Sequence, residues 1–199
     1  MSLLAGARES FGKDSSRVAV IDGSGSFSWQ QFDGMIDRVA GELSGDEDKG
    51  PVFIHSASNS SFLAKFLAAS ATGRPACTLH RDWAEPELEA AIADVAGFEA
   101  GPDDDAGGPV FYIGFTSGTS GRPKPFVRRT ESWTASFGPA GELFNVRAGD
   151  RVFLPGSLQH SHFLFGAVFG LSRGASVRLF EKFDPGLLAT ELEQTSRGV

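Results

Sequence analysis

The chain has 199 residues, of which 41% are hydrophobic and 22% are charged, a composition typical of a globular protein. Its 18 Lys and Arg against 25 Asp and Glu give a net charge of −7, which disfavours binding a nucleic acid backbone across a whole face. The longest run without a polar side chain, 163–171, is too short to span a membrane, and the charged N-terminal segment is unlike a signal peptide. With one cysteine, Cys77, an internal disulfide is excluded, and a cytoplasmic protein is predicted.

Short apolar runs alternate with amphipathic stretches along the whole chain. Runs of β-branched and aromatic residues predict strands, and apolar residues that recur every three or four positions predict helices. Ser28 is the predicted N-cap of the first helix, and Asn59 or Ser60 caps the next. The predicted elements are, in chain order, a strand at Val18–Asp22, a helix with Phe32, Ile36, Val39 and Leu43 on one face, a strand at Val52–His55, a helix with Phe62, Phe66 and Ala69 on one face, a strand at Ala76–Leu79, a helix at Glu85–Val95, strands at Val110–Phe115 and Phe126–Arg128, a helix at Thr130–Phe144, a strand at Arg151–Leu154, a helix at Phe163–Leu171, a strand at Ser176–Phe180 and a last helix that begins at Asp184.

This alternation predicts an α/β fold in which a β-sheet is flanked by helices, and it leaves the order of the strands open. Residues 23–25, Gly-Ser-Gly, predict a turn after the first strand. Residues 99–108 are rich in Asp and Gly and have no apolar period, so they predict a flexible surface linker. Residues 1–199 are otherwise predicted to form a single α/β unit.

One loop concentrates hydroxyl, glycine and cationic residues directly after a predicted strand. Hydroxyls and exposed backbone N–H groups donate hydrogen bonds to phosphoryl oxygens, and glycines let the backbone approach a bulky anion. Lysine adds a point charge and arginine a fork of donors. The loop consists of Thr116, Ser117, Gly118, Thr119, Ser120, Gly121, Arg122, Pro123 and Lys124.

Known nucleotide-binding patterns do not match this loop. A Walker loop needs Gly-Lys followed by Ser or Thr, but Gly121 is followed by Arg122, and the pattern G-x-G-x-x-G does not occur. A nucleophilic serine is also disfavoured, because the chain has no G-x-S-x-G elbow. Composition alone leaves two interpretations open, a phosphate-binding loop and a flexible Ser/Gly turn.

The histidines raise the alternative of a metal enzyme. His160 and His162 are two residues apart, and His55 or His80 would supply a third nitrogen. No third ligand stands at a recognisable spacing, so no metal site of the protein itself is predicted. Cys77 lies within a predicted strand and is interpreted as a buried, inert thiol.

The loop sequence resembles the phosphate-loop signature of the adenylate-forming ligase superfamily, which contains acyl- and aryl-CoA synthetases, peptide-synthetase adenylation domains and luciferases. The flanking sequence agrees in order along nearly the whole chain. The segments that carry the resemblance are Phe27-Ser28-Trp29 with Phe32, His55 to Asn59 followed by Phe62 to Gly73, Phe115-Thr-Ser-Gly-Thr-Ser-Gly-Arg-Pro-Lys124, and Pro155-Gly-Ser-Leu-Gln-His160 with Gly174-Ala175.

The resemblance implies a function. A carboxylate would attack the α-phosphate of ATP to give an acyl-adenylate and pyrophosphate, and a thiol, commonly that of coenzyme A, would then displace AMP. Mg²⁺ would arrive with ATP and bind mainly through phosphate oxygens. His160 would line the acyl pocket and the approach to the adenylate, whereas its alternative role is that of a partly buried helix-cap histidine. The residues implied to hold the β- and γ-phosphates are Thr116, Ser117, Gly118, Thr119, Ser120, Gly121 and Lys124.

Two departures from the family pattern lie beside this loop. Ser120 replaces a more common threonine and keeps the hydroxyl, and Pro125 stands where glycine is usual, so the following strand is expected to be displaced. Family members are more than twice as long. The chain is therefore expected to be the N-terminal subdomain of an acyl-CoA synthetase, inactive alone and self-associating through an uncovered apolar face. The alternative is a natural short module that binds an anion or nucleotide without ligase chemistry.

Overall fold

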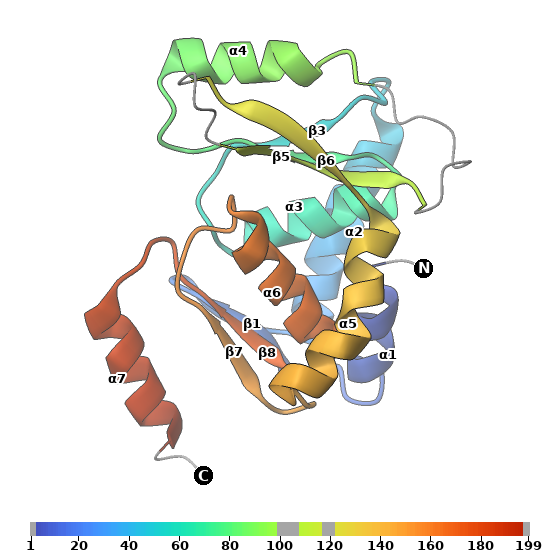
Figure 1. The fold of residues 1–199 in the computed structure, drawn as a ribbon. Coiled ribbons are helices and arrows are strands. Elements are labelled where there is room, and N and C mark those ends of the chain that lie inside the picture. Colours follow the sequence, from blue (N-terminus) through green and yellow to red (C-terminus); the bar gives the residue numbers. More distant parts are fainter. Residues whose placement is uncertain (1–2, 99–107, 117–121, 197–199) are drawn as a thin grey trace.

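The structure is a computed structural model that describes residues 3–98, 108–116 and 122–196 (Figure 1). Within these ranges the strands form two four-stranded sheets, ordered β2-β1-β8-β7 and β3-β4-β5-β6. The elements are α1 (Ala5–Phe11), β1 (Val18–Asp22), β2 (Gly25–Ser28), α2 (Trp29–Gly45), β3 (Val52–Ile54), α3 (Ser60–Ala71), β4 (Ala76–Thr78), α4 (Glu85–Val95), β5 (Val110–Thr116), β6 (Lys124–Arg129), α5 (Thr130–Phe144), β7 (Arg151–Leu154), α6 (Ser161–Ser172), β8 (Ser176–Leu179) and α7 (Pro185–Ser196).

The predicted α/β class is confirmed, and so are the predicted helix caps. The Ser28 hydroxyl accepts a hydrogen bond from the Gln31 N–H at 3.3 Å, and the Gln31 side chain accepts one from the Ser28 N–H, which completes a capping box at α2. At α3 the cap is Asn59, whose side chain accepts from the Phe62 N–H at 3.0 Å. These contacts are local in sequence, which is why the pattern predicted them.

Other elements differ from their predictions. The turn predicted over residues 23–25 is shorter in the structure. Gly25 already begins β2 and pairs with Asp22 in an antiparallel hairpin. Helix α1 was not predicted. Strand β6 begins at Lys124 and helix α6 at Ser161, both two residues earlier than expected. Pairing with a neighbouring strand and packing on a core extend these elements beyond their local signals.

The parallel strands of the two sheets end at a common region. Strand β8 lies parallel to both β1 and β7, and β4 lies parallel to both β3 and β5. Residues that follow β3, β4, β7 and β8 all line one pocket, so the carboxyl ends of these strands meet between the sheets. In α/β proteins, ligands bind at such places.

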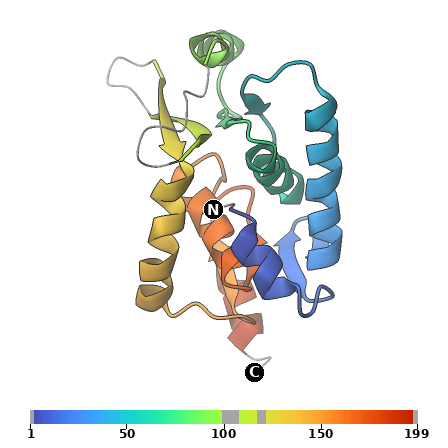
Figure 2. The same cartoon turned by 90° about the vertical axis from the view of Figure 1, so that its right-hand side faces the viewer.

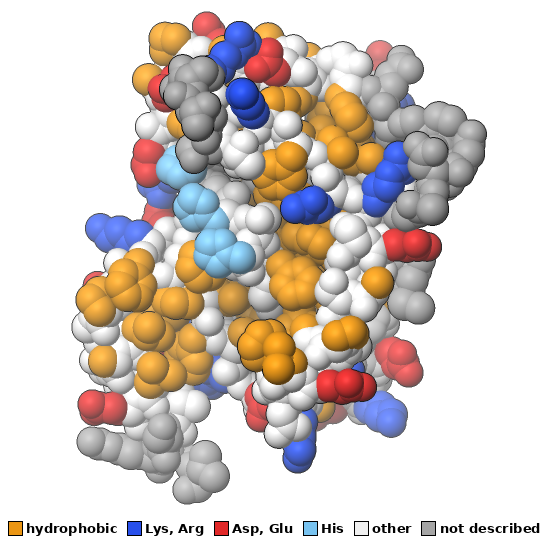
Figure 3. Space-filling view, in the orientation of Figure 1, with side chains coloured by type: hydrophobic (Ala, Val, Ile, Leu, Met, Phe, Trp, Pro, Cys, Tyr) orange, Lys and Arg blue, Asp and Glu red, His pale blue; other side chains and the backbone are white. Residues whose placement is uncertain are grey.

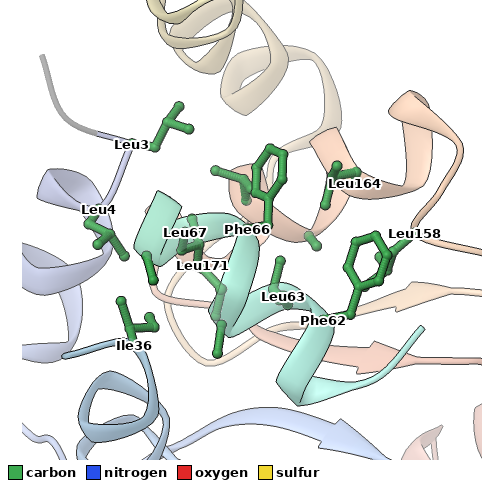
Figure 4. Packing of buried hydrophobic residues seen from close by; sticks show 14 of the residues in the cluster. Leu3, Leu4, Ile36, Phe62, Leu63, Phe66, Leu67, Leu158, Leu164 and Leu171 are labelled. Carbon is green, nitrogen blue, oxygen red and sulfur yellow. The ribbon is translucent and has the colours of Figure 1, made fainter. Parts of the chain in front are cut away.

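Helix α3 fills the space between the sheets and carries the centre of the core. Figure 4 shows Phe62, Leu63, Phe66 and Leu67 of this helix facing residues of the α6 region, such as Leu164. In the turned view of Figure 2, α2 and α5 flank the molecule on opposite sides, with α3 and α6 between them. Among the described residues, no helix combines the length and the apolar character needed to cross a bilayer.

Strand β6 lies at the edge of its sheet and contains Pro125. The residue sits opposite Phe115, and the antiparallel pairing runs on from Lys124 to Arg129. An edge strand tolerates proline because one side of its backbone has no neighbouring strand. Pro125 therefore leaves the second flank of the loop paired to the first.

Candidate functional site

The flanks of the hydroxyl- and glycine-rich loop lie beside the start of α6. Thr116 ends β5 and Lys124 begins β6, and the Thr116 hydroxyl donates to the Lys124 carbonyl at 3.4 Å. A pocket of about 400 Å³ lies between these flanks and α6. The described residues that line it are Thr78, His80, Asp82, Trp83, Phe115, Thr116, Pro123, Gln159 and His160.

The structure thus brings two of the predicted site residues, Thr116 and His160, to one pocket. Lys124 has an exposed side chain and is not one of the described residues lining that pocket. The predicted phosphate-binding residues Ser117, Gly118, Thr119, Ser120 and Gly121 lie outside the described residues, as does nearly all of the predicted linker.

Arg122 pairs with a carboxylate of helix α4. One of its guanidinium nitrogens lies 2.6 Å from the Asp94 carboxylate, and both side chains are partly exposed. Exposed pairs of this kind contribute at most about 1 kcal/mol to stability. The sequence suggested that the guanidinium donors of Arg122 bind an anion, but in the structure they are directed at α4.

Three imidazoles form a row on the face of the molecule seen in Figure 3. The ring centroids of His80 and His160 are 5.6 Å apart, and those of His160 and His162 are 6.0 Å apart. His160 occupies the N-cap position of α6, but its side chain makes no capping hydrogen bond. The alternative role of this residue as a helix cap therefore applies to its backbone and not to its imidazole.

The environment of His160 favours its neutral form. Burial lowers the pKa of the imidazole below its ordinary value of 6.5, and the neighbouring His80 and His162 lower it further, because their charged forms repel a charge on His160. The lowered pKa favours the uncharged ring at neutral pH. The uncharged ring can donate one hydrogen bond and accept another, as a group that orients a polar ligand requires.

A buried serine anchors the segment that carries His160. Ser58, which follows β3, accepts a hydrogen bond from the Leu158 N–H at 2.9 Å, and its hydroxyl lies 3.0 Å from that of Ser157. Ser157 in turn donates to the Gln159 side chain at 3.0 Å. The loop before α6 is therefore tied to the loop before α3, across the two sheets.

Gly156, in the same loop, is closely packed. A Cβ at this position would lie 2.1 Å from Cε2 of Phe163, so a larger residue would displace that ring.

The sequence interpretation missed the anchoring role of Ser58 and considered His80 only as a metal ligand. Their signal was their position after predicted strands, His80 directly after one and Ser58 three residues after another, where polar residues of parallel sheets gather.

The other sequence alternatives can be placed as well. Cys77 is buried in β4, and burial raises the pKa of its thiol to about 12, which agrees with the predicted inert thiol. In the part of the chain that the structure describes, no group of three or more His, Cys, Asp or Glu side chains is arranged to hold a metal ion.

Comparison with curated proteins finds acyl-CoA ligases, whereas no family model matches the chain. An uncharacterized acyl-CoA ligase of Bacillus subtilis, YhfT, is 48% identical over 75 residues, which are 38% of this chain and 16% of the relative. The long-chain-fatty-acid–CoA ligase FadD13 of Mycobacterium tuberculosis is 33% identical over 97 residues, 49% of this chain and 18% of the relative. The matched part of the chain thus spans less than a fifth of the length of these relatives.

Comparison with solved structures confirms the fold. The N-terminal domain of FACL13 from Mycobacterium tuberculosis superposes with a TM-score of 0.82 at 19% identity, over 95% of this chain and 59% of that one. MatB from Rhodopseudomonas palustris superposes with a TM-score of 0.77 at 18% identity, over 96% of this chain and 47% of that one. The resemblance stated from the loop sequence is therefore confirmed: the chain is a homologue of acyl-CoA ligases and has the fold of the N-terminal domain of adenylate-forming enzymes.

Proposed function

We propose that this chain is the N-terminal part of an ATP-dependent acyl-CoA synthetase and carries the loop that holds the phosphates of ATP. The observation that carries the proposal is the shared pocket of Thr116, at the loop's first flank, and His160, at the start of α6. The donor chemistry suits a triphosphate, since a hydroxyl and an ammonium group stand at the two ends of a glycine-rich loop. A cytoplasmic location belongs to the proposal and rests on the single cysteine.

In the proposed reaction a substrate carboxylate oxygen bonds to the α-phosphorus of ATP while the bond to the bridging oxygen breaks, which releases pyrophosphate. Coenzyme A then supplies a thiol that takes the acyl group and releases AMP. The loop residues Ser117, Thr119 and Lys124 would bind the β- and γ-phosphates and stabilise the charge that builds up on the leaving pyrophosphate. Neutral His160 would orient the carboxylate substrate without adding a charge beside it.

Replacing Lys124 with glutamine tests the phosphate loop. We expect the affinity of the chain for ATP with Mg²⁺ to fall by about tenfold or more, because a charge-assisted contact to phosphate is lost. The matched control is Arg128→Gln, which removes an exposed cation from the same strand, β6. It should change the affinity by less than about twofold, since exposed charges away from a site contribute little. Calorimetric titration measures the ATP affinity of both variants. An equal loss of affinity in the two would show that ATP binds a nonspecific cationic surface and would contradict a phosphate-binding loop.

The proposal also holds that this chain does not complete the reaction by itself. Catalysis of adenylate formation depends on several charged groups placed around the reacting phosphate. Since the matched segments span less than a fifth of the curated relatives, we place the remaining groups outside this chain. In the titrations above, ATP should therefore bind without carboxylate-dependent release of pyrophosphate.

Exposed apolar side chains support the proposal that the chain associates with itself. Leu143 and Phe144 at the end of α5 are 77% and 66% exposed, and Phe183 before α7 is 64% exposed. In Figure 3, which has the orientation of Figure 1, apolar side chains gather over the lower part of the molecule, where α7 and the end of α5 lie. We expect the mass measured by light scattering to rise with concentration, and the double variant Leu143→Ser, Phe144→Ser to reduce that rise. A single monomeric mass at every concentration would refute self-association.

A further inference from the structure

Residues 80–83, between β4 and α4, separate two pockets. We name this segment the partition. One of the pockets is that of about 400 Å³ beside the loop, and the other is a pocket of about 680 Å³ at the ends of β7 and β8. Within the partition, Arg81 lines the larger pocket, Trp83 the smaller one, and His80 and Asp82 line both. Opposite the partition, Gln159 and His160 also line both pockets. His80 and His160 therefore meet where the two pockets adjoin.

The partition is held from both sheets. Arg81 forms an ion pair with Glu181, which follows β8 in the first sheet. The Trp83 ring packs edge-on against Phe115 of β5 in the second sheet, with centroids 5.1 Å apart and an interplanar angle of 87°. These contacts lie on either side of His80. The packing of Trp83 on Phe115 contributes more to holding the His80 backbone than the Arg81–Glu181 pair, because that pair is exposed to solvent.

The His80 ring is oriented within this segment. Its Nδ1 accepts a hydrogen bond from the Asp82 N–H at 3.4 Å, and the Trp83 ring lies with its centroid 6.0 Å away. The ring stands edge-on to that of His160, at a centroid distance of 5.6 Å and an angle of 64°. Edge-to-face packing at such distances is a favoured arrangement of rings. His160, by contrast, begins a helix and has no side-chain capping bond to orient it.

From this geometry we propose that His80 is a positioning residue for His160, which it holds by ring packing at the boundary of the two pockets. This proposal depends on the proposed function in one respect, because the proposed function supplies the substrate that His160 faces. A ligand that reaches from the loop pocket into the larger pocket must pass these two rings. The position of His160 then determines how wide that passage is.

The charges around His160 are consistent with this role. His80 of the partition and His162 of α6 are its titratable neighbours, and Asp82, Arg81, Glu181 and Lys182 line the larger pocket with it. Arg81 and Glu181 neutralise each other as a pair. Burial is the largest cause of the lowered pKa of His160, and the ring of His80 lies against this imidazole with centroids 5.6 Å apart.

Three single variants test the proposal by NMR titration of the His160 imidazole in this chain. His80→Ala removes the ring, and we expect the pKa of His160 to rise toward its ordinary value of 6.5 as the imidazole becomes exposed. His80→Phe keeps a ring of similar shape, and His160 should stay below that value. His162→Ala removes a neighbour that is not one of the described residues lining either pocket, and it should raise the pKa less than His80→Ala does.

Each outcome decides the question. An unchanged titration in His80→Ala, an equal rise in His162→Ala, or a rise in His80→Phe as large as that in His80→Ala would overturn the positioning role. A smaller rise in His80→Phe is expected, because the charge of the imidazole is lost with the ring nitrogens. A circular dichroism spectrum of each variant shows whether it has folded, and His80→Phe supplies the test if His80→Ala has not. A parallel titration with pyrophosphate keeps the two proposals separate. If the wild-type chain binds no pyrophosphate while the His160 titrations behave as expected, the phosphate loop is refuted and the role of His80 stands.

Discussion

Replacing Gly114 with alanine should lower the free energy of unfolding by about 1–3 kcal/mol, the range for overpacking a buried site. Gly114 is buried in β5, two residues before the loop begins. A Cβ there would lie 2.5 Å from Cζ of Phe126 and 2.5 Å from the hydroxyl oxygen of Tyr112. Tyr112 is fully buried and accepts a hydrogen bond from Thr78 at 3.3 Å, so it has little room to move. Urea unfolding followed by Trp fluorescence measures the loss.

The control for this variant is Gly34→Ala in helix α2. A Cβ at Gly34 would meet nothing within 4 Å, and the position is exposed. An alanine there should raise stability by about 0.5–1 kcal/mol, since it restricts the unfolded backbone and favours the helix. If Gly114→Ala unfolds at the same urea concentration as the wild type, the inference that residues pack closely around Gly114 is contradicted.

Replacing Phe66 with alanine should lower the free energy of unfolding by about 3–5 kcal/mol, the range for removing a large aromatic side chain from a core. Phe66 is fully buried in α3. Its ring centroid lies 6.0 Å from that of Phe111, 5.7 Å from that of Tyr112 and 6.1 Å from that of Trp133. The three partners come from β5 and α5, so one side chain joins α3 to both. A typical domain has about 5–15 kcal/mol of stability in all.

A matched aromatic variant separates burial from side-chain type. Phe183→Ala removes the same side chain from a position that is 64% exposed, and it should change stability by less than about 0.5 kcal/mol. Both are measured by urea unfolding. Comparable losses in the two variants would contradict the assignment of Phe66 to the centre of the core.

The two predictions concern one packed unit. The Tyr112 ring packs against Phe66, and its hydroxyl oxygen lies 2.5 Å from the position that a Cβ of residue 114 would take. Strand β5 leads directly into Thr116 and the loop. The position of the loop's first flank therefore depends on how the aromatic core packs beneath it.

Local signals in the sequence determined much of the secondary structure. The predicted bounds of β1, α4, α5 and β7 agree with the structure at both ends. Capping residues, apolar periodicity and β-branched runs act within a few residues of one another, so their effect can be read along the chain. The loop sequence and its flanking segments likewise led to the resemblance to acyl-CoA ligases that the comparisons confirm, because a long motif of consecutive residues can be compared without knowledge of the fold.

Contacts between distant segments were decided only by the tertiary structure. The pairing of β1 with β8 in one sheet places Val20 beside Val177. The hydrogen bond from the Leu158 N–H to Ser58 joins residues 100 positions apart, and the packing of His80 against His160 joins residues 80 positions apart. Helix α1 was missed for a similar reason, since it packs against α6. Strand β2 was missed although its hairpin with β1 is local, because its four residues, Gly25–Ser28, contain no apolar run and form a strand by pairing with β1. The sequence by itself thus determined much of the secondary structure and which segments are candidates for carrying the chemistry. The burial of apolar surface between the sheets decided which of those segments face each other, because that free energy depends on the whole packed chain.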